Sequence, residues 1–142
     1  VSKIVRDLER AGDELEKVAK LSIESFDQSE TFGMTEVQRI GDQVGKMLSE
    51  ALTAFARLDV SLAQDIFARD REVDKTYQSA LRSLATFMIE DPRNIGRVLN
   101  VIWIVRALER VGDHATNIAE YVIYLVHGID VRHPRINQNS LK

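Results

Sequence analysis

One stretch, residues 106–120, constrains the fold more than any other part of the chain. Apolar residues recur in and just beyond it at steps of three and four positions, which is the spacing of one helix face. They are Leu108, Val111, Ala115, Ile118, Val122 and Leu125. Polar residues recur at the same spacing on roughly the opposite face: Glu109, Asp113, Thr116, Asn117 and Glu120. The stretch therefore predicts a long amphipathic helix that carries an acidic stripe.

The beginning of this helix occurs twice in the chain. Residues 4–13 match residues 104–113, and eight of the ten positions are identical. A match of this density indicates an internal duplication. Its period of about 100 residues is far longer than a solenoid repeat. The chain is therefore expected to contain parts of two related helical modules, not a stacked array.

The duplicated motif resembles that of the PhoU family. The second copy reads Leu-Glu-Arg-Val-Gly-Asp-His-Ala-Thr-Asn-Ile-Ala-Glu at residues 108–120, and the weaker first copy occupies residues 8–20. The resemblance extends from Val1 to about His133. PhoU proteins resemble two tandem three-helix bundles, and the last helix of each bundle carries the motif. The resemblance implies an all-α fold in which this chain is a fragment. It places the last helix of a first bundle at 1–28, an up-down-up three-helix bundle at 34–128 and a polar tail at 129–142.

The resemblance also implies a function. PhoU proteins are accessory proteins of bacterial high-affinity phosphate transport and negative regulators of phosphate-starvation signalling. Such a protein would be cytoplasmic and would couple a phosphate transporter to a phosphate-sensing histidine kinase. Its expected partners are the sensor kinase and the ATPase subunit of the transporter. The alternative is a metal-binding helical scaffold or adaptor without a phosphate role.

Composition narrows the class of protein further. The chain has no cysteine, which excludes disulfides and thiolate metal sites. Its net charge of −3 gives no general reason to bind nucleic acid. No run of 18 or more apolar residues is present, so no membrane insertion is expected. These features are typical of a globular helical protein.

Four helices can be placed from periodicity and capping signals. The first is expected over 1–28, with an inward stripe of Ile4, Leu8, Ala11, Leu15, Val18 and Ser22. Because most of its own bundle is absent, we expect that stripe to dock on a second copy of the chain in a homodimer. A turn at 29–34 precedes a second helix, for which Thr35 and Gln38 fit a capping box.

The remaining boundaries depend on Asp, Pro and Gly. Asp59 or Ser61 is expected to cap a third helix over 60–89. Asp91 followed by Pro92 predicts the start of a fourth helix, and Gly128 predicts its end. Its first half should be filled by Val98, Leu99, Ile102 and Trp103.

Three acidic pairs share an i, i+4 spacing, which places both carboxylates of a pair on one helix face. They are Glu9 with Asp13, Asp70 with Asp74, and Glu109 with Asp113. Asn117 and Glu120 extend the last pair. Oxygen-rich clusters suit cations such as Mg, Ca, Mn or iron, and some PhoU proteins hold iron or zinc clusters through such motifs. We expect binding to be stronger at the second motif, because Lys17 and Lys20 add positive charge to the first.

Other interpretations of these residues remain open. The acidic stripes are also typical of a solvated helix face with Arg10 and Arg110 nearby. Asp70 either lies at the wet edge of its helix seam or is buried with a partner, such as Arg106 or a cation. His114 is interpreted as a surface histidine, because the first copy has Glu14 in its place.

An enzyme is not expected. A di-iron bundle enzyme needs Glu-x-x-His pairs on two helices, whereas His114 follows Glu109 by five positions. The chain also has no Gly-rich phosphate loop and no nucleophile beside a base. The sequence therefore favours a regulatory protein.

Overall fold

The described part of the chain consists of helices and short connections and contains no strand. The computed structural model describes residues 2–25 and 33–132, and the side chains within 3–23 and 33–128. Its elements are α1 (Ser2–Ser25), α2 (Met34–Arg57), α3 (Val60–Glu90), the short 3-10 helix η1 (Pro92–Asn94) and α4 (Ile95–Arg132). The all-α prediction is confirmed. No helix in the described ranges is long and apolar enough to cross a membrane.

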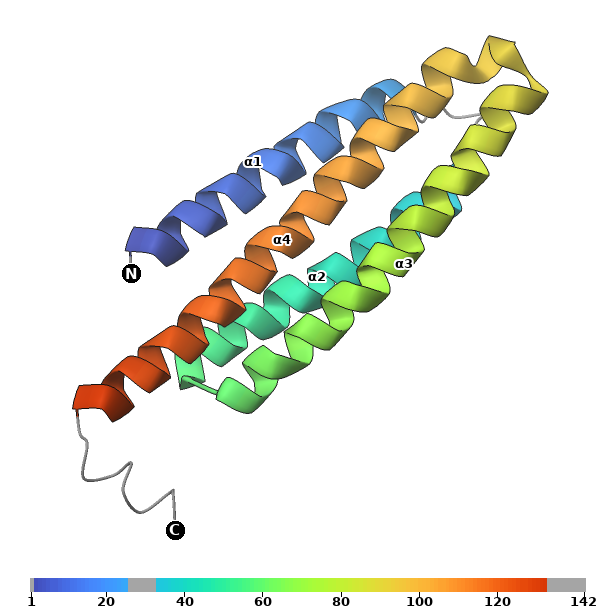
Figure 1. Cartoon of the computed structure of the whole chain (residues 1–142). Helices are drawn as coiled ribbons and strands as arrows, with labels where there is room; N and C mark the ends of the chain where they lie inside the picture. The colour runs from blue at the N-terminus through green and yellow to red at the C-terminus, as the bar shows by residue number, and fades with distance from the viewer. Residues whose placement is uncertain (1, 26–32, 133–142) are drawn as a thin grey trace.

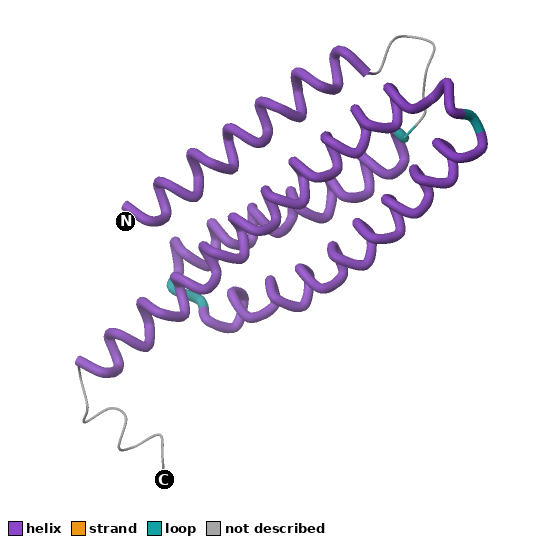
Figure 2. The backbone as a smooth tube through the Cα atoms, turned by 45° about the horizontal axis from the view of Figure 1, so that its top comes forward, coloured by secondary structure: helices purple, strands orange, loops and turns teal. Residues whose placement is uncertain are grey.

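The longest helix, α4, forms the centre of the arrangement (Figure 1). It packs against α2 and α3 in an up-down-up bundle, and α1 lies antiparallel to it on its other side (Figure 2). Among the described residues, α1 contacts α4 and makes no comparable contact with α2 or α3. Part of the α1 stripe that was expected to dock on a second copy therefore packs on α4 of its own chain.

The core of the bundle is built from aliphatic side chains of α2, α3 and α4. Its largest fully buried members include Ile40, Met47, Ile66, Leu84, Ile104 and Ile118. Burial of each such side chain contributes about 1.5–3 kcal/mol. Gly112 allows α2 to approach α4 closely, because a Cβ atom at this position would lie 3.3 Å from Val44 Cγ1.

The connections on either side of α3 follow the predicted capping signals. Asp59 Oδ1 accepts a hydrogen bond from the Leu62 amide at 3.0 Å. Asp91 Oδ1 accepts one from the Arg93 amide at 3.1 Å, and Pro92 begins the 3-10 turn that leads into α4. The predicted join between these helices is confirmed.

The start of α2 differs from the prediction. Gly33 precedes the helix with a φ of 76°, a left-handed conformation, and no side chain caps the helix. The helix begins at Met34, so Thr35 already lies inside the first turn and cannot form the expected capping box. The predicted turn at 29–34 falls mostly outside the described residues.

The end of α4 also differs. The helix continues through Gly128 to Arg132. One glycine within a helix costs only about 1 kcal/mol relative to alanine, so it need not end the helix. The expected tail at 129–142 therefore begins in helix, and residues 133–142 lie outside the described part.

Two faces were assigned wrongly. Trp103 is 50% exposed and Leu99 is 43% exposed, because both lie on the face of α4 opposite to the buried Val98 and Val101. On α1, the face against α4 includes the acidic residues Asp7 and Glu14, whereas Leu15 is exposed. The contact between the two repeated helices therefore has a polar component that apolar periodicity does not reveal.

Candidate functional site

Four of the predicted acidic residues gather between α3 and α4. Asp70 and Asp74 come from α3, and Glu109 and Asp113 come from α4. We call these four residues the acidic cluster. Burial raises the pKa of Asp70, and the charges of Asp74 and Asp113 raise it further. The two i, i+4 pairs therefore face each other across the helix contact, as helix geometry allows.

The two α4 carboxyls of the acidic cluster show the same effect. Burial is the main reason that the pKa of Glu109 is raised, followed by the charges of Asp113, Asp74 and Asp70. The pKa of Asp113 is raised by burial and by Asp74. Asp74 and Asp113 are nevertheless exposed. Neighbouring like charges disfavour the ionised forms, so a proton or a cation would relieve the repulsion.

Nearby positive groups only partly offset this repulsion. The Arg110 guanidinium lowers the pKa of Glu109 and of Asp113, but burial and the other carboxylates outweigh it. Asp70 is stabilised in its ionised form by the Thr116 hydroxyl and by Arg71. Arg106, the partner considered for Asp70 from the sequence, acts instead on the pKa of Tyr77.

The acidic cluster does not form a ready-made chelate. Within the described ranges, no three His, Cys, Asp or Glu side chains surround one point closely enough to hold a metal ion. Its donors are all carboxylate oxygens, the ligand type that hard divalent cations prefer. The donor set therefore fits such a cation, provided that the partly exposed side chains rotate toward it.

The other predicted metal ligands lie elsewhere. Glu9 and Asp13 are exposed on α1, and no described helix faces them. Glu120 is exposed and lies beside Lys3, Tyr121 and Tyr124. The predicted acidic row along α4 is therefore divided between two contacts. Its first members lie beside α3, and its later members lie beside α1, because the row winds around the helix.

Asn117 belongs to a hydrogen-bonded group between α1 and α4. Asp7 is only 5% exposed, and its Oδ1 accepts a hydrogen bond from Asn117 Nδ2 at 3.2 Å. His114 Nδ1 lies 3.1 Å from the same oxygen. The His114 side chain is only 15% exposed, so its interpretation as a surface histidine was wrong. These three residues, which we call the Asp7 triad, satisfy a buried carboxylate as buried polar groups require.

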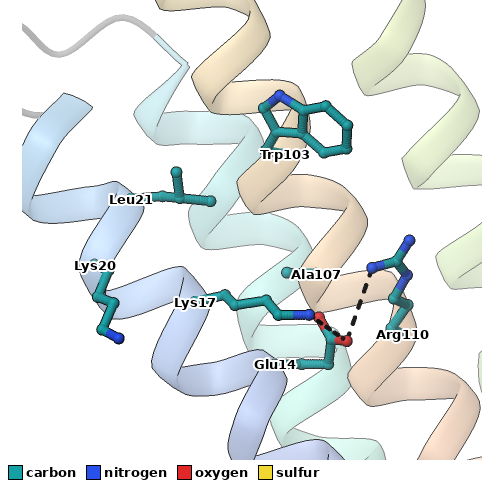
Figure 3. Close-up of a pocket in the computed structure, with 7 residues that line it drawn as sticks. All are labelled: Glu14, Lys17, Lys20, Leu21, Trp103, Ala107 and Arg110. Carbon is teal, nitrogen blue, oxygen red and sulfur yellow. Dashed lines mark hydrogen bonds and ion pairs between the residues drawn. The ribbon is translucent and has the colours of Figure 1, made fainter.

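The duplication places a second polar group at the other end of the same contact. Residues 7, 14 and 17 correspond to residues 107, 114 and 117 in the repeat, and the two helices run antiparallel. Glu14 Oε1 therefore lies near α4, 3.8 Å from Arg110 Nη1, and Lys17 Nζ lies 3.2 Å from it (Figure 3). Ala107 stands where the first copy has Asp7. The two copies thus form the same helix contact with different chemistry.

These positions are the ones that sequence periodicity missed. The repeats differ at 7/107, 14/114 and 17/117, and all three pairs lie in the contact between α1 and α4. The two antiparallel copies of the motif are related by an approximate twofold axis, so a residue that changes in one copy changes the contacts of the other copy. Of the three, only 7/107 stands out in the sequence, as one of two mismatches within the well-preserved residues 4–13.

Comparison with known proteins agrees with the architecture. A model of the PhoU domain matches residues 37–122. The chain belongs to the PhoU family. The crystal structure of PhoU from Pseudomonas aeruginosa aligns with a TM-score of 0.85 and 57% identity, covering 89% of this chain and 61% of that one. The crystal structure of the phosphate transport system regulatory protein PhoU from Streptococcus pneumoniae aligns with a TM-score of 0.78 and 26% identity, covering 88% and 59%.

Sequence relatives give the same result. The phosphate-specific transport system accessory protein PhoU homolog of Pseudomonas aeruginosa is 58% identical over 134 residues, which cover 94% of this chain and 55% of that protein. The PhoU protein of Escherichia coli K12 is 38% identical over 133 residues, with the same two coverages. The chain therefore spans about half the length of these PhoU relatives.

Proposed function

We propose that this chain is part of an accessory protein of a phosphate transport system that holds phosphate-starvation genes off when phosphate is plentiful. The observation that supports this most is the 58% identity, over 94% of the chain, to a protein named as a phosphate-specific transport accessory protein. The long helical seams and charged faces suit a protein that acts through binding. The expected partners are the ATPase subunit of the transporter and a phosphate-sensing histidine kinase.

Deletion of the full-length gene tests this function. Starvation genes should then stay on in high phosphate, and the intact gene supplied on a plasmid should restore repression. A reporter gene under a starvation promoter provides the measurement. Continued repression in the deletion strain would contradict the regulatory role and favour the alternative, a metal-binding scaffold or adaptor without a phosphate role.

We further propose that the acidic cluster binds a divalent cation such as Mg or Mn, or an iron or zinc ion. What supports this is the position of Asp70, Asp74, Glu109 and Asp113 between two helices, where burial and mutual repulsion raise the pKa values of three of them. A cation there would neutralise like charges that the fold holds together. Mg²⁺ is commonly bound through one or two carboxylates, with water molecules completing its shell.

Titration with Mn²⁺ tests the cation site. Asp113→Asn should weaken binding strongly, because it removes a charged ligand from the acidic cluster. The matched control is Asp65→Asn, which makes the same change at an exposed position of α3 and should leave binding unchanged. Equal titrations for wild type and Asp113→Asn would show that the acidic cluster is only a solvated helix face.

A further inference from the structure

A cavity lies between α1 and α4, away from the acidic cluster. Its volume is about 460 Å³, which is within the range of about 300–1,000 Å³ seen for small-molecule sites. It is lined by Glu14, Lys17, Lys20, Leu21, Trp103, Ala107 and Arg110 (Figure 3). Charged groups and an apolar wall therefore meet in one space.

The charges of this cavity favour an anion. Three cationic side chains, Lys17, Lys20 and Arg110, and one carboxylate, Glu14, are among the residues that line it. Lys17 and Arg110 share the same carboxylate oxygen, at 3.2 and 3.8 Å, so most of their N–H donors remain available. Lys20 pairs with the exposed Glu16, and such a surface pair contributes little. An anionic group can therefore bind here without first breaking a strong ion pair.

Apolar side chains from both helices complete the lining of the cavity (Figure 3). Trp103 is half exposed and lines the cavity with Leu21 and Ala107. The Arg106 guanidinium lies 5.6 Å from the centre of the Trp103 ring, which holds positive charge on that side as well. Indole rings form favourable offset or edge-to-face contacts with other aromatic groups. This apolar lining suits the aromatic part of a ligand whose acidic group reaches the lysines.

An unsatisfied oxygen is an independent sign of a ligand. Glu14 is only 9% exposed, and its Oε2 atom is buried with no hydrogen-bond partner among the described residues. Buried polar atoms are normally satisfied, because leaving one unpaired costs about 1–3 kcal/mol. At the other end of the contact, the buried Asp7 carboxylate does have partners on α4, namely His114 and Asn117. A ligand with a hydrogen-bond donor could satisfy Glu14 Oε2, for which Ala107 and its neighbours provide no donor.

The duplication explains why only one end of the contact has this chemistry. The corresponding space at the other end is smaller, about 350 Å³, and is lined by Lys3, Glu120, Tyr121 and Tyr124. Glu120 there replaces the positive charge of Lys20, and Lys3 replaces Trp103. Three cationic side chains and an indole ring therefore line the larger cavity and not its counterpart at the other end of the helix contact, although the same two helices form both.

We propose that the α1–α4 cavity binds a small organic anion that carries an aromatic ring and a hydrogen-bond donor. The anionic group pairs with Lys17, Lys20 and Arg110, the ring packs on Trp103 and Leu21, and the donor reaches the Glu14 carboxylate. Because both helices contribute, the bound ligand would hold α1 against α4. This site is separate from the acidic cluster, and its existence does not depend on cation binding there.

The fluorescent probe 1-anilinonaphthalene-8-sulfonate tests the proposal, since it combines a sulfonate, aromatic rings and one N–H donor. Trp103 is the single tryptophan of the chain, so its quenching can be followed together with probe emission. We expect saturable binding at one site per chain. N-phenyl-1-naphthylamine, which lacks the sulfonate, should bind at least about tenfold more weakly, since a hydrogen bond to a charged group is worth about 1.5–3 kcal/mol.

Three variants localise the site. Lys20→Gln should weaken binding of the sulfonate about threefold to tenfold, whereas Lys75→Gln, the same change at an exposed position of α3, should have less than about a twofold effect. Ala107→Leu should fill the cavity and abolish binding, with helical content checked by circular dichroism. Equal effects of the two lysine variants, or equal binding of the two probes, would overturn the proposal. If Ala107→Leu fails to fold, the comparison of Lys20→Gln with Lys75→Gln still tests the site.

Discussion

Replacement of Asp7 by alanine should loosen the contact between α1 and α4 markedly. The variant removes a buried carboxylate oxygen that lies within 3.1–3.2 Å of donors on His114 and Asn117. A hydrogen bond to a charged group contributes about 1.5–3 kcal/mol. His114 and Asn117 are partly exposed and can regain water, and the cost of burying the charge disappears. We therefore expect a total loss of about 1.5–3 kcal/mol, not the sum of two full contributions.

Urea unfolding measures this loss. Trp103 fluorescence reports on the neighbourhood of α1, because the indole and Leu21 line the same cavity, and circular dichroism reports on all helices. With a slope of about 2 kcal/mol per M, the fluorescence midpoint should fall by about 0.7–1.5 M. A cycle with Asn117→Ala should give a coupling energy of about 0.5–1.5 kcal/mol between the two side chains.

Two results would refute this reasoning. One is a loss below about 0.5 kcal/mol for Asp7→Ala, since that is the range of ordinary surface substitutions. The other is additivity of the two single variants. The matched control is Asp13→Ala, which removes an exposed carboxylate from the same helix and should change stability by less than about 0.5 kcal/mol.

Four further predictions concern stability and assembly. Gly33→Ala should lower the free energy of unfolding by about 1–3 kcal/mol, read from thermal melts, because φ is 76° and a Cβ atom would lie 2.7 Å from Val101 Cγ1. Met47→Ala should cost about 2–5 kcal/mol in urea unfolding through the cavity it leaves in the core. Asp113→Asn without metal should raise stability at pH 7 by about 0.2–0.5 kcal/mol. Because the pKa of Asp113 is raised in the folded state, ionisation of this residue lowers the stability of the wild type once the pH exceeds the pKa of a free Asp. The extra stability of the variant should therefore vanish below about pH 4. Equal melting of wild type and variant at both about pH 7 and about pH 4 would contradict this prediction. Sedimentation should show self-association, for which the exposed Val5, Leu15 and Ile23 of α1 provide apolar area; a monomer at millimolar concentration would contradict it.

Local signals in the sequence were sufficient for most of the helix boundaries. Asp59 caps the start of α3, and Asp91 caps the 3-10 turn that leads into α4; each accepts a hydrogen bond from an amide only two or three residues away. Features of this kind can be read from sequence because both partners are neighbours in the chain. The start of α2 was missed because a left-handed glycine and a nearby threonine offer competing signals, and only the packing of Gly33 against Val101 decides between them.

The candidate sites were less accessible to sequence reasoning. The i, i+4 spacing correctly paired Glu109 with Asp113, but only the packing of α3 on α4 brings Asp70 and Asp74 into the same electrostatic field. Asn117 was predicted as a further ligand because it continues the polar row of Glu109 and Asp113. It hydrogen-bonds to a residue 110 positions earlier in the chain, and no local pattern encodes such a partner.

Within the part of the chain that the structure describes, α1 packs on α4 alone, and this has a consequence for how the molecule opens. The α2–α4 bundle buries its own core, whereas α1 is held by one helix contact. Segments with few buried contacts open with a smaller free energy than the global unfolding of the protein. Amide hydrogens of α1 should therefore exchange with solvent faster than those of α3. The α1–α4 cavity bridges this contact, as the Asp7 triad does, so a ligand bound in the cavity would slow hydrogen exchange in α1 specifically. A protein that binds α1 only when it is docked on α4 would then bind more tightly when the cavity holds a ligand.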